Sequence, residues 1–449
     1  PPPRDHTRRE LDECMRESIA SLQVYRTYVR PGTGEEVSAA DRAVIDAMVQ
    51  EATRRRPDLD PEVFALLGQV LRLELTGDEA SDLVWRFQQT TGPVAAKGVE
   101  DTALYRWFPL AALNEVGGEP DRFGWSPAEF HSDCERRARE RPLAMLTTAS
   151  HDTKRGEDVR ARLAVLSEMP GEWAALAERW ARRNERHRAA AGQPDGAIEL
   201  LLYQTLVGAW PLAPVRAFEY MEKAAREAKL HTSWLEPDPT YERALRNFTA
   251  AVLADPDFVR DLESFVARII DPGRVNGLVQ KLLCLTAPGV PDVYQGTDLW
   301  DLSLVDPDNR RPVDFSLRAR LLEELEALGP RAAAAAWQRR SEGLPKLLVV
   351  ARALRLRAAR PTAFAEGDYS ALAAGGTAAG HLVAFGRGAD VVVAVPRLTA
   401  QLVGRWADTW LDLPPGTWSD VFTGAALGGR VAAARLFAGF PVALLERVG

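Results

Sequence analysis

Residues 150–163, SHDTKRGEDVRARL, combine a histidine and an aspartate with a run of further charged side chains, directly after a short apolar stretch at 143–146. The apolar stretch is typical of a buried parallel strand, and helical periodicity resumes at Gly156, so that 147–155 reads as a strand-to-helix loop. Lys154 and Arg155 would favour the ionised form of a neighbouring carboxylate. An ionised Asp152 beside His151 could accept hydrogen bonds from sugar hydroxyls or stabilise positive charge developing on a ring carbon.

The same residues also fit a purely structural interpretation. Asp152 could cap the following helix, while the basic residues pair with Glu157 and Asp158 at the surface. The motif taken alone favours this structural interpretation, so that its surroundings in the chain must decide between the two.

The elements that would position these residues change in character along the chain. Apolar residues recur at helical spacing over 4–86, give way to short candidate strands and Gly/Pro-rich loops over 87–150, and return to helical spacing over 156–274. Short β-type runs follow at 382–385, 391–395 and 442–445. We therefore predict an α/β fold. It comprises a helical insertion region over 1–86, the C-terminal half of a (β/α)8 TIM barrel over 87–330 with a large helical insertion at 156–274, and a linking helix and small antiparallel β-sandwich domain over 331–449.

Composition narrows the class of protein. The chain has 449 residues, of which 46% are hydrophobic and 27% charged, which is typical of a globular protein with two or more domains. No apolar run approaches the roughly 20 residues that span a bilayer, and PPPRDHTRRE has no signal-peptide character. Cys14, Cys134 and Cys284 lack the spacing of a zinc site. We expect a cytoplasmic protein, and the net charge of -7, with arginines interleaved among acids, argues against a nucleic-acid surface.

Seven longer segments resemble the maltooligosyltrehalose synthase family, a branch of the α-amylase superfamily, and they extend over nearly the whole chain. The segments are VYRTY (24–28), AAKGVEDTALYRW (95–107), LNEVGG (113–118), SHDTKRGEDVRARL (150–163), LYQTLVGAWP (202–211), AKLHTSWLEPDPTYE (228–242) and TAPGVPDVYQGTDLWDLSLVDPDNRRPVD (286–314). The wider superfamily would show only the His-Asp pair and a PGxPxxYxG turn, so the seven together indicate this branch. One departure is Gly156, where the family more often has Ser.

The resemblance implies roles for the residues of the first segment discussed above. Asp152 matches the third carboxylate of the superfamily, which binds sugar hydroxyls and helps to stabilise the transition state, and His151 matches the adjacent hydroxyl-binding histidine. Lys154 and Arg155 are expected to touch the substrate or to orient Asp152.

The resemblance also suggests substrate-binding residues at 97–106. The candidates are Lys97, Glu100, Asp101, Tyr105 and Arg106. The ring of Tyr105 could stack on a glucose face. The alternative is that Glu100 or Asp101 merely forms a salt bridge with Lys97 or Arg106.

The roles that we expect for two further groups of residues are less specific. Trp234 and Tyr241 either stack on sugars or anchor a loop, and the anchor interpretation is slightly favoured. A turn network that closes the last barrel loop is expected from Asp306, Asp308, Asn309 and Arg310, while Arg311 is left unassigned.

Two catalytic groups of this chemistry have no match in the chain. A retaining glycosidase needs a nucleophile and a proton donor about 5 Å apart. Neither a Gly-x-Arg-x-Asp nucleophile segment nor the acid/base Glu of the next strand is found, and Asp46 lies in a helical run. We therefore expect the C-terminal portion of a longer protein, whose unclosed barrel exposes an apolar edge, with the N-terminal barrel segment possible on another chain.

For the complete enzyme the resemblance implies an intramolecular transglycosylation, an isomerisation that converts the reducing-end α-1,4 bond of a maltooligosaccharide to an α,α-1,1 bond. It implies no metal or organic cofactor, and it implies maltooligosyltrehalose trehalohydrolase as a pathway partner in trehalose biosynthesis. The charge pattern and the lack of a long apolar run argue against a nucleic-acid or membrane partner. Two alternatives stay open. One is another α-glucan hydrolase or glucanotransferase of the superfamily, and the other is a non-catalytic α-glucan-binding fragment or partner half.

Overall fold

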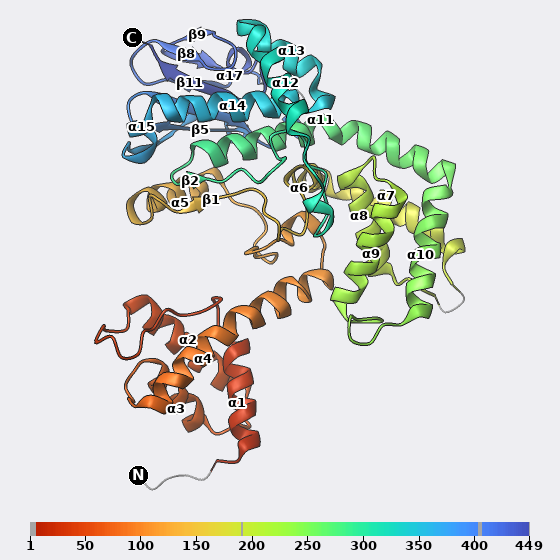
Figure 1. The fold of residues 1–449 in the computed structure, drawn as a ribbon. Helices are drawn as coiled ribbons and strands as arrows, with labels where there is room; N and C mark the ends of the chain where they lie inside the picture. Colours follow the sequence, from red (N-terminus) through yellow and green to blue (C-terminus); the bar gives the residue numbers. More distant parts are fainter. Residues whose placement is uncertain (1–5, 190–191, 403–405, 449) are drawn as a thin grey trace. The chain divides into compact units, whose positions relative to one another are not determined.

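The computed structural model describes residues 6–189, 192–402 and 406–448. The chain forms two compact units (Figure 1). Pro1–Trp107 and Glu227–Lys229 make up the first, here called the helical unit, and Phe108–Arg226 and Leu230–Gly449 make up the second, the large unit. No helix among the described residues is long and apolar enough to cross a membrane.

The described residues 6–107 of the helical unit form four α-helices. They are α1 (Arg8–Ala20), α2 (Ala39–Arg55), α3 (Pro61–Leu71) and α4 (Asp78–Ala95), and a π-helical turn at Ala96–Glu100 and a 3-10 turn at Ala103–Tyr105 follow. Three of the helices begin at side-chain caps, because Thr7, Ser38 and Asp60 accept hydrogen bonds from the first backbone amides. The helical spacing predicted over 4–86 is confirmed from Arg8 onward, and residues 4 and 5 lie outside the described residues.

Helices also dominate the first two thirds of the remaining chain. They are α5 (Pro127–Glu140), α6 (Glu157–Ala164), α7 (Pro170–Asn184), α8 (Gly196–Ala209), α9 (Pro214–Ala228), α10 (Pro239–Ala254), α11 (Pro256–Thr286), α12 (Phe315–Ala327), α13 (Ala332–Gln338), α14 (Leu344–Ala359) and α15 (Pro361–Ala365). The helical insertion predicted over 156–274 is therefore helical, and its last helix, α11, continues to Thr286.

The apolar stretch at 143–146 forms a parallel strand, but a short and exposed one. Strand β1 (Met145–Leu146) pairs in parallel with β2 (Val290–Pro291). The expectation that this strand is buried is wrong, because Leu143 is 73% exposed and Met145 68% exposed. A parallel strand is buried when further strands and helices continue on both sides. In the described residues the parallel sheet has two strands and closes no barrel.

The C-terminal part of the large unit contains two antiparallel sheets. The six-stranded sheet has the order β3-β5-β6-β11-β8-β9, and the three-stranded sheet has the order β10-β7-β4. The strands are β3 (Tyr369–Leu372), β4 (Ala374–Gly375), β5 (Leu382–Arg387), β6 (Val391–Pro396), β7 (Trp410–Asp412), β8 (Trp418–Asp420), β9 (Ala426–Leu427), β10 (Arg430–Ala432) and β11 (Ala443–Arg447). The three predicted β runs are confirmed as β5, β6 and β11, and so is antiparallel β structure in this part of the chain.

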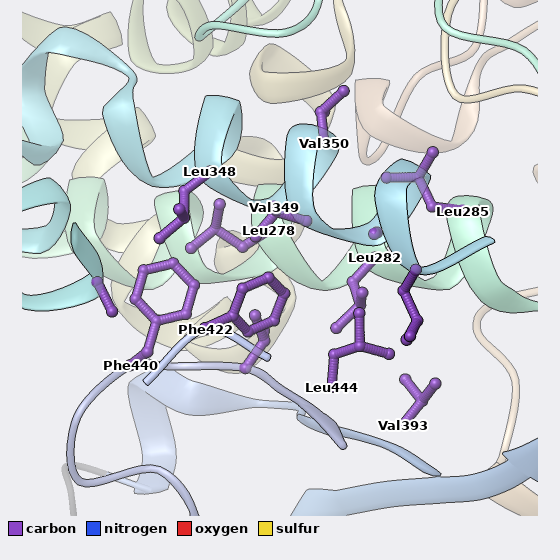
Figure 2. Close-up of a cluster of buried hydrophobic side chains, with 14 of the residues drawn as sticks. Leu278, Leu282, Leu285, Leu348, Val349, Val350, Val393, Phe422, Phe440 and Leu444 are labelled. Atoms are coloured by element: carbon purple, nitrogen blue, oxygen red, sulfur yellow. The ribbon is translucent and has the colours of Figure 1, made fainter. Parts of the chain in front are cut away.

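The central strands β5, β6 and β11 of the six-stranded sheet are buried on both faces, whereas the outer strands β3 and β9 have exposed residues. Alternate residues of β6 and β11, including Val393 and Leu444, contact helices α11 and α14 in one apolar core (Figure 2). The intervening residues, including Val392, share a second core with Leu411 and Val431 of the three-stranded sheet. This two-sided burial explains why the predicted runs are apolar at every position instead of alternating with polar residues.

The buried Asp420 of β8 gives the large unit a pH-dependent stability. Its carboxylate accepts hydrogen bonds from the Phe422 amide and the Thr423 hydroxyl, both at 2.9 Å, yet burial raises the pKa of Asp420 from 3.8 to about 6. Between these values the folded chain holds a proton that the unfolded chain has lost, so the free energy of unfolding falls as the pH rises.

We predict that Asp420→Asn removes this contribution. The difference between the unfolding free energies at about pH 4.5 and about pH 7, from urea titrations, should change by about 1–3 kcal/mol relative to the unsubstituted chain. The matched control is Glu366→Gln at an exposed position, which should leave the difference unaltered. An identical pH dependence in the Asp420 variant would contradict this assignment.

Candidate functional site

The loop between β1 and α6 presents His151 and Asp152 to solvent. Helix α6 begins at Glu157 after a cap at Gly156 that makes no side-chain hydrogen bond. The structural interpretation in which Asp152 caps this helix is therefore wrong. The Asp152 amide donates to the Ser150 hydroxyl at 3.2 Å, while its carboxylate accepts no hydrogen bond from any residue that the structure describes. This carboxylate is thus available to a ligand.

Glu115 fixes the backbone of the loop by accepting hydrogen bonds from its amides. Its carboxylate is buried and accepts hydrogen bonds from the amide of Lys154 at 2.6 Å and from that of Arg155 at 3.2 Å. The same carboxylate lies 3.4 Å from the guanidinium of Arg160, which also donates to the carbonyl oxygen of Thr148. Glu115 and Arg160 together therefore hold both ends of the loop.

Lys154 and Arg155 follow Asp152, but their side chains are buried, with 3% and 2% exposure. The Arg155 guanidinium donates to the carbonyl oxygen of Ala111 at 3.1 Å and to the Tyr220 hydroxyl at 2.8 Å. Arg155 therefore holds the loop through Ala111 and Tyr220, and its expected role in orienting Asp152 stays a prediction. Direct contact of either side chain with a substrate stays a prediction.

A second loop, at 301–311, lies against the first. The Gly156 amide donates to the carbonyl oxygen of Ser303 at 2.7 Å, and the Asn309 side-chain amide donates to the carbonyl oxygen of His151 at 2.9 Å. A Cβ atom on Gly156 would lie 2.7 Å from the Asp301 carbonyl oxygen, so this close approach depends on glycine. The position where the family more often has Ser is thus tightly confined in this chain.

The turn network predicted at 306–310 is confirmed. Arg216 binds the Asp308 carboxylate through two hydrogen bonds of 2.8 and 2.7 Å, and the Leu304 amide donates to the same carboxylate at 2.7 Å. Arg310 pairs with Asp306. Arg311, which was left unassigned, also joins the network, because it donates to the carbonyl oxygen of Asp308 at 2.9 Å.

A buried ionic cluster anchors the first turn of α6. Its four members are Glu157 and Asp158 of α6, Lys281 of α11 and Lys346 of α14, all less than one tenth exposed. Lys281 lies 2.9 Å from the Glu157 carboxylate, and Lys346 bridges Glu157 and Asp158, with 2.6 Å to the latter. The expectation that Glu157 and Asp158 pair with Lys154 and Arg155 at the surface is therefore wrong.

Electrostatics of the cluster differ between its two carboxyl groups. Burial opposes ionisation of Glu157, but Lys346 and Lys281 outweigh it and hold its pKa at about 2. Burial raises the pKa of Asp158 to about 6, against the opposing pull of Lys346. Glu157 is thus firmly ionised, while Asp158 takes up a proton at mildly acidic pH.

We predict that Lys346→Met lowers the free energy of unfolding by about 3–5 kcal/mol, because it leaves two buried carboxylates with one lysine. Urea unfolding monitored by tryptophan fluorescence measures the change. Arg331→Met, at an exposed position, is the control and should alter stability by less than about 0.5 kcal/mol. A near-native stability of the Lys346 variant would show that the cluster does not anchor α6.

We predict that Glu115→Gln loosens the loop without unfolding the chain, since the amide side chain keeps one acceptor but loses the charge. Hydrogen–deuterium exchange of peptides covering 147–155 should quicken by about tenfold, which corresponds to roughly 1.4 kcal/mol. Glu119→Gln, exposed in the same segment, serves as the control. Unchanged exchange in the Glu115 variant would mean that other contacts hold the loop.

The second group of candidate residues belongs to the helical unit. Lys97 and Asp101 form an ion pair at 2.5 Å, as the alternative interpretation of this segment expected. Glu100 is buried and accepts a hydrogen bond from the Tyr25 hydroxyl. The ring of Tyr105 is 4% exposed, so its faces are not open to solvent in this structure.

Arg106 completes this group, and its guanidinium donates to the carbonyl oxygen of Ala228 at 2.6 Å within the helical unit. The predicted site residues therefore fall into two sets. Residues 97–106 belong to the helical unit, and residues 151–155 belong to the large unit. Substrate contact by the first set stays a prediction.

The two aromatic candidates differ in exposure. Tyr241 of α10 is 2% exposed and stacks on His231 with ring centroids 4.7 Å apart, so it anchors the loop that precedes α10, as expected. Trp234 is 54% exposed, and the Arg226 guanidinium lies 4.9 Å from its ring centroid.

Sequence reasoning did not single out Glu115, Lys281 or Lys346. Lys281 and Lys346 each interrupt an apolar run, VQKLLCL and LPKLLVV, and a lysine inside such a run is a signal that it has a buried partner. Glu115 lies in the LNEVGG segment, but its type alone does not reveal that it binds backbone amides.

One group of side chains in the described part of the chain has the spacing of metal ligands. It consists of His6, Glu10 and Asp60 in the helical unit, with ligand atoms within 4.8 Å of one another. Asp60 already caps α3.

Comparison with known proteins shows which enzymes the chain is similar to. No family model matches the chain. A putative maltooligosyl trehalose synthase of Mycobacterium tuberculosis is 43% identical over 413 residues, which cover 90% of this chain and 50% of the relative. The maltooligosyltrehalose synthase structure from Arthrobacter ramosus superposes with a TM-score of 0.85 at 38% identity, covering 98% of this chain and 54% of that one.

A third similar protein is a hypothetical maltooligosyl trehalose synthase of Sulfolobus tokodaii, whose structure superposes with a TM-score of 0.72 at 28% identity and covers 97% of this chain and 53% of that one. The chain spans about half the length of each of these relatives. The seven segments and these matches agree, and the chain is a homologue of the maltooligosyltrehalose synthases over that half.

Proposed function

We propose that this chain supplies part of a maltooligosyltrehalose synthase and that Asp152 is one of its catalytic carboxylates. The observation that carries the proposal is the exposed Asp152 carboxylate on a loop whose backbone is fixed by Glu115 and Asn309, in a chain homologous to these enzymes over half of their length. A carboxylate on a fixed backbone beside His151, with no hydrogen bond to any described residue, suits the binding of neighbouring sugar hydroxyls.

In the proposed reaction the reducing-end α-1,4 bond of a maltooligosaccharide is broken and a covalent glycosyl-enzyme forms. The released glucose turns over, and its anomeric hydroxyl attacks to give an α,α-1,1 bond, so that the reaction is an isomerisation. Asp152 would hold hydroxyls of the sugar at which the bond is cleaved and stabilise positive charge on its ring as the bond breaks. A trehalohydrolase would consume the product.

A nucleophile and a proton donor about 5 Å apart are also required. We infer that both come from the half of the relatives that this chain does not match. The exposed parallel pair β1 and β2 supports this inference, because Leu143 and Met145 would be covered when further strands close a (β/α)8 barrel.

For the substrate side, we propose that His151 and Asp152 contact the sugar and that Arg155 is a positioning residue. Lys154 and the helical-unit residues Lys97, Glu100, Asp101, Tyr105 and Arg106 are proposed as further contributors to substrate binding. Their buried or paired side chains would then have to become accessible to the sugar.

The function is tested by product analysis. The chain alone, and the chain joined to the part of the Arthrobacter ramosus enzyme that it does not cover (the completed enzyme), are incubated with maltohexaose. Loss of reducing ends at constant chain length supports the synthase. Shortened chains would indicate a hydrolase or glucanotransferase instead, and binding without any reaction in either protein would indicate a non-catalytic α-glucan-binding protein.

We predict that Asp152→Asn lowers the turnover of the completed enzyme by about 10²–10⁴-fold and leaves its melting temperature unchanged, because the carboxylate forms no hydrogen bond or ion pair with a described residue. Asp412→Asn on β7 is the matched control and should retain full activity. Near-normal turnover of the Asp152 variant would show that Asp152 has no catalytic role.

A further inference from the structure

A cavity of about 360 Å³ lies in the large unit beside α6, and no residue of the 147–155 loop lines it. Its lining includes Asp158 and Arg162 of α6, Arg274 of α11, and Trp210, Trp300 and Arg318. The volume is near the lower end of the range of about 300–1,000 Å³ for small-molecule sites. The cavity therefore has room for more than a bare ion.

Arg162 is the unusual member of this lining. It is 6% exposed, and its guanidinium donates to the carbonyl oxygen of Trp210 at 2.7 Å. Within the described ranges it forms no ion pair with a carboxylate. Burial and the nearby Arg274 lower the pKa of Arg162 to about 10, against the opposing influence of Asp158. A buried cation that has a carboxylate nearby but none in direct contact is unfavourable unless something binds to it.

The surroundings of Arg162 carry an excess of positive charge. Arg274 and Arg340 both pair with the Asp271 carboxylate, at 2.9 and 3.0 Å. Together with Arg162, three guanidinium groups therefore have one directly paired carboxylate between them. The remaining charged groups of the lining are balanced in pairs. Asp158 pairs with Lys346, Glu342 with Arg339, and Arg318 with Asp298. The uncompensated charge is thus centred on Arg162 and Arg274.

We propose that this cavity binds a phosphate group, free or carried on a monosaccharide. A guanidinium offers a planar set of donors that matches an oxyanion. Two adjacent arginines favour a doubly charged phosphate over a singly charged carboxylate. The indole rings of Trp210 and Trp300, which also line the cavity, offer apolar faces to a sugar ring. The ligand would bind against α6, the helix that follows the Asp152 loop.

The proposal is tested by titrating the chain with inorganic phosphate and, separately, with glucose 6-phosphate, against potassium chloride at matched ionic strength. Tryptophan fluorescence and melting temperature report binding. Both should respond saturably to at least one phosphate compound, and tighter binding of glucose 6-phosphate would identify the sugar-bound form. No saturable response to either compound would overturn the proposal.

Two variants locate the site. Arg162→Gln should weaken binding by about tenfold or more, as expected for the loss of a charge-assisted hydrogen bond. Ser341→Glu places a negative charge at an exposed position of the lining, leaves α6 unaltered, and should weaken binding similarly even if the first variant folds poorly. Arg331→Gln, at an exposed position, should bind as the unsubstituted chain does. Unaltered affinity in Ser341→Glu and in a folded Arg162→Gln would place the ligand elsewhere and contradict the proposal.

Discussion

The buried ionic cluster is the interaction on which the candidate site depends. Charges taken out of water are tolerated when each has a partner in good geometry. Lys281 and Lys346 meet this condition only while Glu157 and Asp158 stay between them, and this requirement ties α6 to α11 and α14. Close packing reinforces the arrangement, since a Cβ atom on Gly273 of α11 would lie 2.9 Å from the Arg162 Cα. The start of α6 is thereby fixed, and this also fixes the C-terminal end of the 147–155 loop, which is continuous with the helix.

The side chains in and around the 147–155 loop have two different roles. The buried residues hold the structure, since Arg155 binds carbonyl and hydroxyl oxygens and Glu115 binds the amides that precede α6. The exposed Asp152 carboxylate accepts no hydrogen bond from the described residues. A catalytic carboxylate needs this combination, because its position must be set by the backbone while its oxygen atoms stay available to the substrate.

Much of this arrangement could be predicted from the sequence, and the limits have physical reasons. Helical periodicity over 4–86 and 156–274, the β runs and the parallel strand within 143–146 depend on local pattern and were recognised. The short strands predicted over 87–150 are wrong for residues 127–140, which form helix α5. Burial of the parallel strand was predicted wrongly, because burial depends on neighbours that a local pattern does not contain. The partners of Glu157 were also missed, since Lys281 lies 124 positions away along the chain. The roles of Asp152 and His151 came from the family resemblance, and their residue types alone favoured a helix cap that the structure does not show.

The most direct test of this account is a crystal structure of the completed enzyme, carrying Asp152→Asn, with maltohexaose bound. We predict that the side chain at position 152 and the imidazole of His151 lie within hydrogen-bond distance of hydroxyl groups on one glucose unit. Glu115 and Arg155 should keep the contacts described above. A maltohexaose chain that binds elsewhere, with the side chain at position 152 still facing solvent, would contradict the account.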